Sequence, residues 1–333
     1  MKMITFDSFT LVPSYSDITS RSEVDTSISI CGAKSELPII NANMLAICTP
    51  EMVDVLSNKH STFSSYHRFF ESESTKINAI KTILNVPDPQ RKQLIQKFWM
   101  SIGTKQSEYT FIDSLYKLGI KNVIVDVNHG HHLAVKEMTQ WIKETYPDML
   151  VMAGNVSSTD GIKFLKDSGA DIIKIGNSFG STCSTRLATS FGVTSIHCAK
   201  TYREDTNDWD VNLCADGGIR SPADIVKALI WSDLVMIGGM FGGCDESFGT
   251  KIVSNGVCYK ETYGNASIKT KQVADETNHV KFIEGETKLV NSTGPLSLSL
   301  KGIKEGLQSA FSFIGARNLK EFQSKVQNQI LML

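Results

Sequence analysis

The sequence predicts an α/β fold, a (β/α)8 TIM barrel with further segments added around it. Short β-prone apolar runs recur eight times, and segments with helical period or helix-start signals lie between them. Strands that alternate with helices in this way form parallel βα units, and eight such units close into a barrel. The chain of 333 residues has the length of one such barrel with additions.

The boundaries of the expected elements follow from these patterns. The barrel strands are expected at Leu37 to Met44, Ser61 to His67, Phe98 to Gly103, Lys121 to Asn128, Met149 to Val156, Ala170 to Asn177, Asp210 to Asp216 and Asp233 to Met240. Helices are expected at Glu51 to Asn58, Tyr109 to Leu118, His131 to Tyr146, Ser158 to Asp167, Ser221 to Ile230 and, last, Leu300 to Leu319. Pro50 and Pro222 stand where a first helical turn tolerates proline.

The remaining segments are interpreted as additions to a single barrel domain over residues 1–333. Residues 1–36 form an irregular lead-in to which the pattern assigns no role in the core. Residues 243–295 are polar and turn-rich and too long for an ordinary loop, which predicts a mobile lid after the eighth strand. The last residues, Lys320 to Leu333, are expected to extend the final helix or to dock on a neighbouring subunit.

Composition excludes several classes of protein. A hydrophobic fraction of 41% with 8 Pro and 24 Gly excludes a disordered chain, and a net charge of -1 argues against a general nucleic-acid binder. The amino terminus lacks the apolar run of a signal peptide, and no stretch approaches the roughly 18 apolar residues of a membrane helix. A cytoplasmic protein without membrane contact is expected. The seven cysteines form no CxxC pair and no Cys/His cluster, so neither disulfides nor a metal site are predicted.

Polar residues and glycines gather where the predicted strands end. In a (β/α)8 barrel the loops after the strands form one active face, so Asp126, Asn155 and Asp216 are expected on the same rim. Glycine pairs follow the last two strands, Gly217 with Gly218 and Gly238 with Gly239. Backbone N–H groups at this position often bind phosphate, although glycine pairs also serve simple turns.

Cys183 is the candidate nucleophile. It follows the predicted strand that ends at Asn177, in a small polar loop, and Ser181, Thr182, Ser184 and Thr185 surround its thiol with hydroxyl groups. An isolated cysteine is more often a packing residue, so context has to decide. Glu284, in the segment Glu-Gly-Glu-Thr, is a candidate acid or base, with a solvated charge run as the alternative.

Several motifs together resemble the IMP dehydrogenase/GMP reductase family, from about Ser20 to Lys320. They are Ser20-Arg-Ser-Glu-Val-Asp25, Leu37-Pro-Ile-Ile-Asn-Ala-Asn-Met44, Met152-Ala-Gly-Asn-Val156, Gly180-Ser-Thr-Cys-Ser-Thr-Arg186, Ala215-Asp-Gly-Gly218, Val235-Met-Ile-Gly-Gly-Met240 and Glu284-Gly-Glu-Thr287.

The resemblance implies roles for residues at matching positions. Cys183 resembles the nucleophile that attacks purine C2, Thr185 with Glu284 resembles the proton relay, and Arg68 takes the place of a catalytic lysine. The implied substrate-binding residues are Ser181, Asp216, Gly217, Gly218, Gly238, Gly239, Asn265, Ala266, Ser267 and Gly285. The implied cofactor-binding residues are Ser20, Arg21, Asp126, Val127, Asn128 and Lys281.

The resemblance implies the reductase activity, in which a homotetramer converts GMP to IMP and ammonia with NADPH, and NADH is the alternative cofactor. The dehydrogenase branch supplies an Arg-Tyr pair on its lid to activate water, whereas this chain has no arginine between Arg220 and Arg317. IMP dehydrogenase is therefore the second hypothesis. The third is a nucleotide-binding barrel without turnover.

Departures from the family pattern motivate that third hypothesis. Arg68 replaces lysine, Leu45-Ala46 follows Met44 where the family has Asp-Thr, and Asn177-Ser-Phe179 replaces a glycine-rich cation-binding pattern. The last change makes a monovalent cation doubtful. Gln308 stands where arginine is common, which leaves the choice between NADPH and NADH open.

Overall fold

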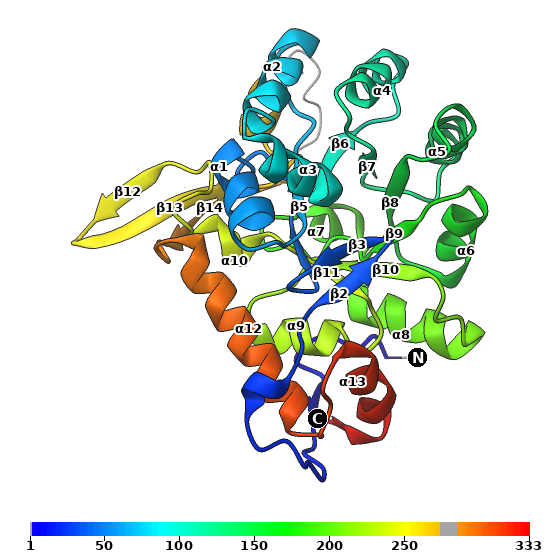
Figure 1. The fold of residues 1–333 in the computed structure, drawn as a ribbon, viewed down its shortest axis with the longest axis vertical. Coiled ribbons are helices and arrows are strands. Elements are labelled where there is room, and N and C mark those ends of the chain that lie inside the picture. The colour runs from blue at the N-terminus through cyan, green and yellow to red at the C-terminus, as the bar shows by residue number, and fades with distance from the viewer. Residues whose placement is uncertain (1, 274–284) are drawn as a thin grey trace.

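A computed structural model describes residues 2–273 and 285–333, and its centre is an eight-stranded parallel barrel (Figure 1). The strand order is β4-β11-β10-β9-β8-β7-β6-β5, and a parallel bridge between Ile40 and Phe63 joins the two ends. The strands are β4 (Ile39–Asn41), β5 (Ser64–Tyr66), β6 (Phe98–Ile102), β7 (Asn122–Asp126), β8 (Leu150–Val156), β9 (Ile172–Ile175), β10 (Asn212–Asp216) and β11 (Leu234–Ile237). Each lies inside one of the eight predicted runs, so the predicted fold is confirmed.

The predicted helices are also found between the strands. They are α1 (Pro50–Val53), which continues as the π-helical segment Asp54–Lys59, α4 (Ser107–Lys117), α5 (Leu133–Thr145), α6 (Thr159–Asp167) and α9 (Pro222–Ala228). The Ser158 and Ser221 side chains accept hydrogen bonds from the backbone N–H groups of Gly161 and Asp224, in the first turns of α6 and α9. Further helices were not predicted, namely α2 (Glu73–Ile83), α3 (Asp88–Lys97), α7 (Thr185–Thr189), α8 (Ser195–Thr206) and α10 (Gly239–Gly242).

The lead-in takes part in the core, contrary to expectation. Its apolar side chains Ile4, Phe6, Phe9, Val24, Ile28 and Ile30 are buried in the same cluster as the barrel strands. Two short strands, β2 (Ile28–Ile30) and β3 (Ala33–Ser35), form a hairpin within it. Burial of these side chains stabilises the lead-in on the barrel.

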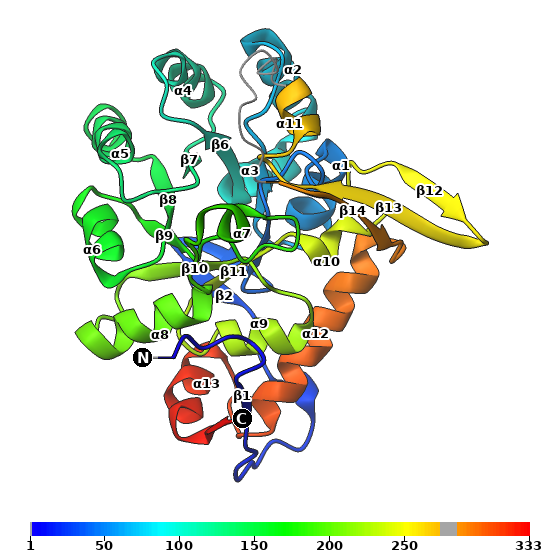
Figure 2. The same cartoon turned by 180° about the vertical axis from the view of Figure 1, so that it is seen from behind.

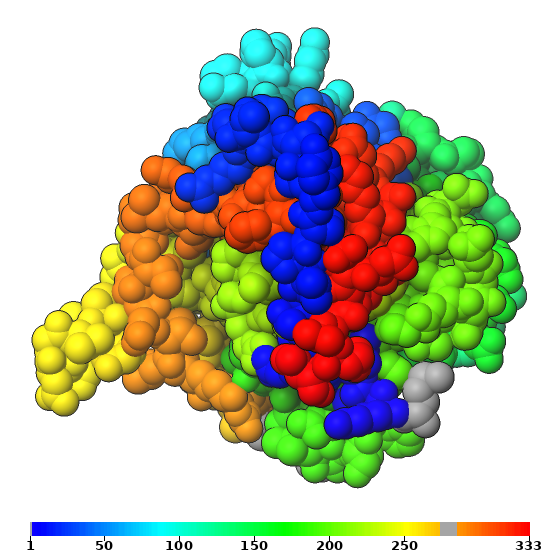
Figure 3. All heavy atoms as spheres, turned by 90° about the horizontal axis from the view of Figure 1, so that it is seen from below, coloured from blue at the N-terminus to red at the C-terminus, as the bar shows by residue number. Residues whose placement is uncertain are grey.

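The C-terminal segment packs against the N-terminal segment of the same chain and does not extend the last barrel helix. The last barrel helix, α12, spans Leu296–Ser312, and a separate helix, α13, spans Leu319–Val326. Strand β15 (Ile330–Met332) then pairs antiparallel with β1 (Phe9–Leu11). Figure 3 shows the first residues running between the C-terminal helices.

The segment 243–295 contains regular structure where the sequence indicated turns. Strands β12 (Lys251–Ser254), β13 (Val257–Tyr263) and β14 (Thr287–Asn291) form an antiparallel sheet that projects from the barrel, and a short helix, α11 (Ile268–Val273), follows β13 (Figure 2). Within the described part of the chain, no helix is long and apolar enough to cross a membrane.

Candidate active site

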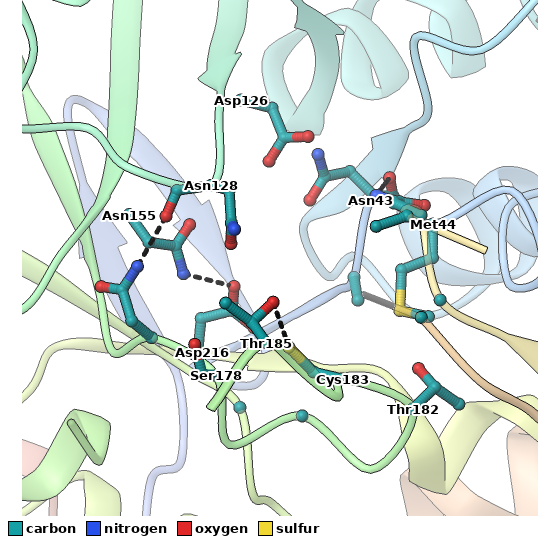
Figure 4. A pocket seen from close by; sticks show the side chains of 18 of the residues that line it. Asn43, Met44, Asp126, Asn128, Asn155, Ser178, Thr182, Cys183, Thr185 and Asp216 are labelled. Carbon is teal, nitrogen blue, oxygen red and sulfur yellow. Dashed lines mark hydrogen bonds between the residues drawn. The ribbon is translucent and has the colours of Figure 1, made fainter. Parts of the chain in front are cut away.

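A cavity of about 360 Å³ opens at the carboxyl ends of the barrel strands. The loops after β4, β5, β7 and β9 line it, together with residues at or near the ends of β8, β10 and β11 and residues of the inserted segment (Figure 4). The described lining residues that the sequence predicted are Arg68, Asp126, Val127, Asn128, Cys183, Thr185, Asp216, Gly217, Asn265, Ala266 and Gly285. Most of the predicted site therefore lies around one space.

Cys183 lies half-buried in this lining, with its thiol 3.3 Å from the hydroxyl oxygen of Thr185. Thr185 is buried at the first position of α7, so the backbone fixes the hydroxyl beside the sulfur. Burial raises the pKa of the Cys48 and Cys198 thiols to about 12, which keeps those two protonated within the core. Among the cysteines of the described residues, Cys183 is the one that lines the cavity.

The Cys183 loop begins with a close approach between two strands. Gly176 has a φ of +102°, and a Cβ there would lie 2.5 Å from the Asp216 carbonyl oxygen. Only glycine fits this position. One residue later, the side-chain amide of Asn177 donates to the Asn128 carbonyl oxygen at 2.6 Å, which ties the Cys183 loop to the loop after β7.

The inserted segment packs directly against the other side of this loop. Backbone bonds run from Glu286 N–H to the Thr182 carbonyl oxygen (2.9 Å) and from Gly264 N–H to the Glu286 carbonyl oxygen (3.2 Å). Gly285 forms an isolated antiparallel bridge with Cys183, and a Cβ on Gly285 would lie 2.7 Å from Ser267 N. Gly285 and the 264–267 segment therefore meet beside the thiol. Glu284 and Lys281 lie outside the described residues.

Four charged side chains lie on the barrel side of the cavity. Lys174 Nζ is 2.9 Å from Asp126 Oδ1 and 3.4 Å from Asp216 Oδ2, and Arg68 Nε is 3.7 Å from Asp126 Oδ2. Burial alone would raise the pKa of Asp126, but Lys174 and then Arg68 outweigh it and hold that pKa below its ordinary value of 3.8. The Asn155 amide donates to Asp216 Oδ2 at 2.9 Å. Asp126 is thus held as a carboxylate.

Of the predicted phosphate-binding residues, Gly217 lines the cavity, whereas Ser181, Gly218, Gly238 and Gly239 are outside the lining. A Cβ on Gly239 would be 3.0 Å from Ser181 Oγ, and one on Gly217 would be 3.3 Å from Gly180 N. Gly218 has the Phe6 ring 3.3 Å from its Cβ position. The exposed Ser181 hydroxyl and the loops after β10 and β11 are therefore neighbours. Gly238 caps α10 beside them.

Two of the predicted cofactor-binding residues, Ser20 and Arg21, lie away from the cavity. Ser20 caps the short 3-10 helix η1 (Arg21–Glu23), which contacts α12, and neither Ser20 nor Arg21 lines the cavity. Sequence reasoning in turn gave no role in the site to Asn43, Asn155, Phe179 and Lys174, which line the cavity, although it expected Asn155 on this rim. Lys174 had a signal, because it is a charge inside the apolar run Ile172 to Ile175.

Comparison with known proteins shows the family of this chain. The family model described as the IMP dehydrogenase / GMP reductase domain matches residues 3–331. The chain belongs to the IMP dehydrogenase/GMP reductase family. Three relatives named GMP reductase show how far the similarity extends. The protein from Enterococcus faecalis is 33% identical over 329 residues, which cover 96% of this chain and 94% of the relative.

The other two relatives are as similar. The Oenococcus oeni protein is 32% identical over 344 residues, with 99% of each chain covered. The Helicobacter pylori protein is 33% identical over 329 residues, covering 96% of this chain and 94% of its own. Members of the IMP dehydrogenase/GMP reductase family with these names are enzymes, and we conclude that this chain is one as well. Its ligands are expected among small purine nucleotides.

Proposed function

We propose that this protein is a GMP reductase that converts GMP to IMP and ammonia with NADPH, through a covalent adduct between Cys183 and purine C2. The observation that carries the proposal is the half-buried Cys183 thiol in the cavity, 3.3 Å from the Thr185 hydroxyl and bridged to Gly285. Glu284, the second member of the proposed relay, directly precedes Gly285 in the sequence. The names of the relatives point to the same reaction.

The proposed reaction replaces the amino group at C2 with the Cys183 sulfur and then replaces the sulfur with hydride. Cys183 sulfur adds to C2, and the bond from C2 to the exocyclic nitrogen breaks as Thr185 and Glu284 deliver a proton to the leaving ammonia. Hydride then arrives at C2 and the C–S bond breaks, which regenerates the thiolate. In total, GMP, NADPH and two protons give IMP, NADP⁺ and ammonium. The chain's own residues align the purine and move the protons.

The surroundings of the thiol suit a purine nucleotide. The two protein contacts to Asp216 both fall on Oδ2, so among the described residues Oδ1 is left for a ribose hydroxyl. We assign the base to the segment Asn265-Ala-Ser267. The phosphate is assigned to the edge formed by Ser181, Gly217, Gly218, Gly238 and Gly239. Net charge is not needed there, because backbone N–H groups supply the contacts.

A nicotinamide cofactor fits the opposite side of the cavity. Asn43 and Arg68 line the cavity beside Asp126, and Arg68 Nε lies 3.7 Å from Asp126 Oδ2. N–H donors of this kind suit a carboxamide oxygen. Asp126, Val127 and Asn128 would hold the ring, which supplies the hydride when bound. Ser20 and Arg21 would reach it only from a second copy, in keeping with the proposed homotetramer.

The direction of reaction follows from the groups near the inserted segment. Water activation needs a base, and the segment 221–316 contains no arginine. Burial and Glu261 raise the pKa of Tyr263 to about 12, which keeps this phenol protonated. Lys269 is ion-paired with Glu261 at 2.5 Å. These observations favour reduction over IMP dehydrogenase activity.

The test is a pair of incubations with the full chain. With GMP and NADPH, nicotinamide absorbance should fall as IMP and ammonium form in equal amounts. With IMP and NAD⁺, no XMP should appear under the same conditions. Steady XMP production at a comparable rate would favour IMP dehydrogenase, and nucleotide binding without either reaction would favour the barrel without turnover.

Glu284→Gln is expected to slow the chemical step about a hundredfold, the scale usual for acid/base groups. Single-turnover absorbance at saturating GMP and NADPH measures that step. Glu286→Gln is the matched control, because the exposed Glu286 carboxylate pairs with Lys288 at 3.1 Å. An unchanged rate in Glu284→Gln would show that this carboxylate is only a surface charge.

A further inference from the structure

Strand register places Asp126, Gly154, Lys174 and Cys214 in one row across four neighbouring strands. Asp126 pairs with Gly154, Gly154 with Lys174, and Lys174 with Cys214. Partners in a parallel sheet point to the same face, so the row lies on the cavity side with Asp126 and Lys174. Asp216 lies two residues beyond Cys214 on that face.

Gly154 is the reason that Lys174 can reach Asp126. A Cβ at position 154 would lie 2.4 Å from the Lys174 carbonyl oxygen and 2.7 Å from Lys174 Cβ. Because Gly154 has no side chain, space remains between β9 and β7 for the Lys174 side chain. Lys174 Nζ crosses this gap and meets Asp126 Oδ1 at 2.9 Å, while Asp216 Oδ2 lies 3.4 Å away on the other side.

Lys174 is almost fully enclosed. Its side chain is 4% exposed, against 13% for Asp126 and 23% for Asp216. A buried ammonium ion is stable only with close counter-charges. Burial alone would lower the pKa of Lys174, but Asp126 and Asp216, with a smaller contribution from Cys214, raise it above its ordinary value. The Lys174 side chain is therefore protonated at neutral pH, and its ammonium group lies between the two carboxylates.

We infer that Lys174 is a positioning residue that joins Asp126, on the proposed cofactor side, and Asp216, on the proposed ribose side, into one charged unit. This inference rests on the proposed function for the identity of the two ligands. It adds a residue that touches neither ligand in that proposal. Lys174 acts through the two carboxylates, because its ammonium group holds Asp126 Oδ1 at 2.9 Å and Asp216 Oδ2 at 3.4 Å.

Lys174→Met is expected to weaken GMP binding about tenfold at neutral pH, because Asp216 loses one of its two side-chain contacts. Titration calorimetry with GMP alone measures this without cofactor or turnover. Lys143→Met is the matched control: Lys143 pairs with Asp171 at 3.0 Å near the start of β9, and neither residue lines the cavity. GMP affinity in Lys143→Met should equal that of the parent.

The pH dependence of Tm separates a charge effect from loss of packing. In the parent, the low pKa of Asp126 stabilises the fold above pH 3.8, and acid removes this stability. In Lys174→Met, Arg68 and Asn43 still oppose the effect of burial, but the largest opposing charge is gone, so the pKa of Asp126 is expected to rise. The buried carboxylate then destabilises the fold at neutral pH, and protonation in acid removes this destabilisation. The Tm difference between parent and variant should therefore be largest near pH 7 and narrow toward about pH 4.

The double variant Lys174→Met/Asp126→Asn removes both charges and keeps the inference testable if Lys174→Met does not fold. Its Tm at neutral pH should exceed that of Lys174→Met, while its GMP affinity stays low. GMP affinity equal to the parent, or an equal loss in Lys143→Met, would overturn the inference. A parent that binds no purine mononucleotide would overturn the proposed function instead, and the Tm pattern would then decide the role of Lys174.

Discussion

Cys183→Ala is expected to abolish turnover of GMP while GMP binding stays within about tenfold of the parent. The sulfur forms the proposed covalent bond, and the neighbouring Thr185 hydroxyl does not replace it, because an alcohol is a far weaker nucleophile at neutral pH. Apart from Ser181, the groups assigned to ribose and phosphate lie on other strands, with Asp216 on β10 and the glycine pairs after β10 and β11. Binding and chemistry should therefore separate in this variant.

The measurement pairs a turnover assay with calorimetric titration of GMP. Cys258→Ala serves as the control, since Cys258 is also half-buried but lies on β13 and does not line the cavity. It should keep nearly full activity. Turnover in Cys183→Ala within tenfold of the parent would exclude the covalent route, even if GMP reduction itself were observed.

The barrel was predictable because its strands are locally encoded. Each buried strand is a short apolar run bounded by polar residues, and that pattern does not depend on distant parts of the chain. The β12 to β14 sheet carries no such signal, because every residue of β12 is exposed. The lead-in was missed for a different reason. Phe6 and Phe9 are buried by packing against distant elements, such as Trp231 against Phe9, and no local period marks them.

The candidate site also has one part that could be predicted from the sequence and one part that could not. Cys183 and Thr185 are two residues apart in one loop, so their contact could be expected from the sequence. The position of Lys174 between Asp126 and Asp216 depends on the register of β7 to β10. It also depends on the absence of a side chain at Gly154. Lys174 is 48 residues from Asp126 and 42 residues from Asp216 in the sequence, and only that register makes them neighbours. Local pattern carries no information about it.

The second large effect is expected at Asp216, the proposed ribose ligand. Asp216→Ala should weaken GMP binding by about 3 to 4 kcal/mol, a several-hundredfold rise in Kd, as loss of a charged partner in a partly buried site typically does. The variant removes the acceptor for the sugar hydroxyls. It also leaves the Asn155 amide without its 2.9 Å contact and Lys174 with Asp126 as its remaining counter-charge among the described residues.

Asp216→Asn distinguishes these two contributions. The amide keeps the shape and one acceptor oxygen but removes the negative charge, so its affinity for GMP should lie between those of the parent and Asp216→Ala. Calorimetric titration of all three proteins at the same pH and salt gives the order directly. Equal GMP affinity in the parent and Asp216→Ala would mean that the ribose binds elsewhere. Because Lys174 faces Asp216 and not Asp126 alone, Asp216→Ala should also lower the Tm at neutral pH.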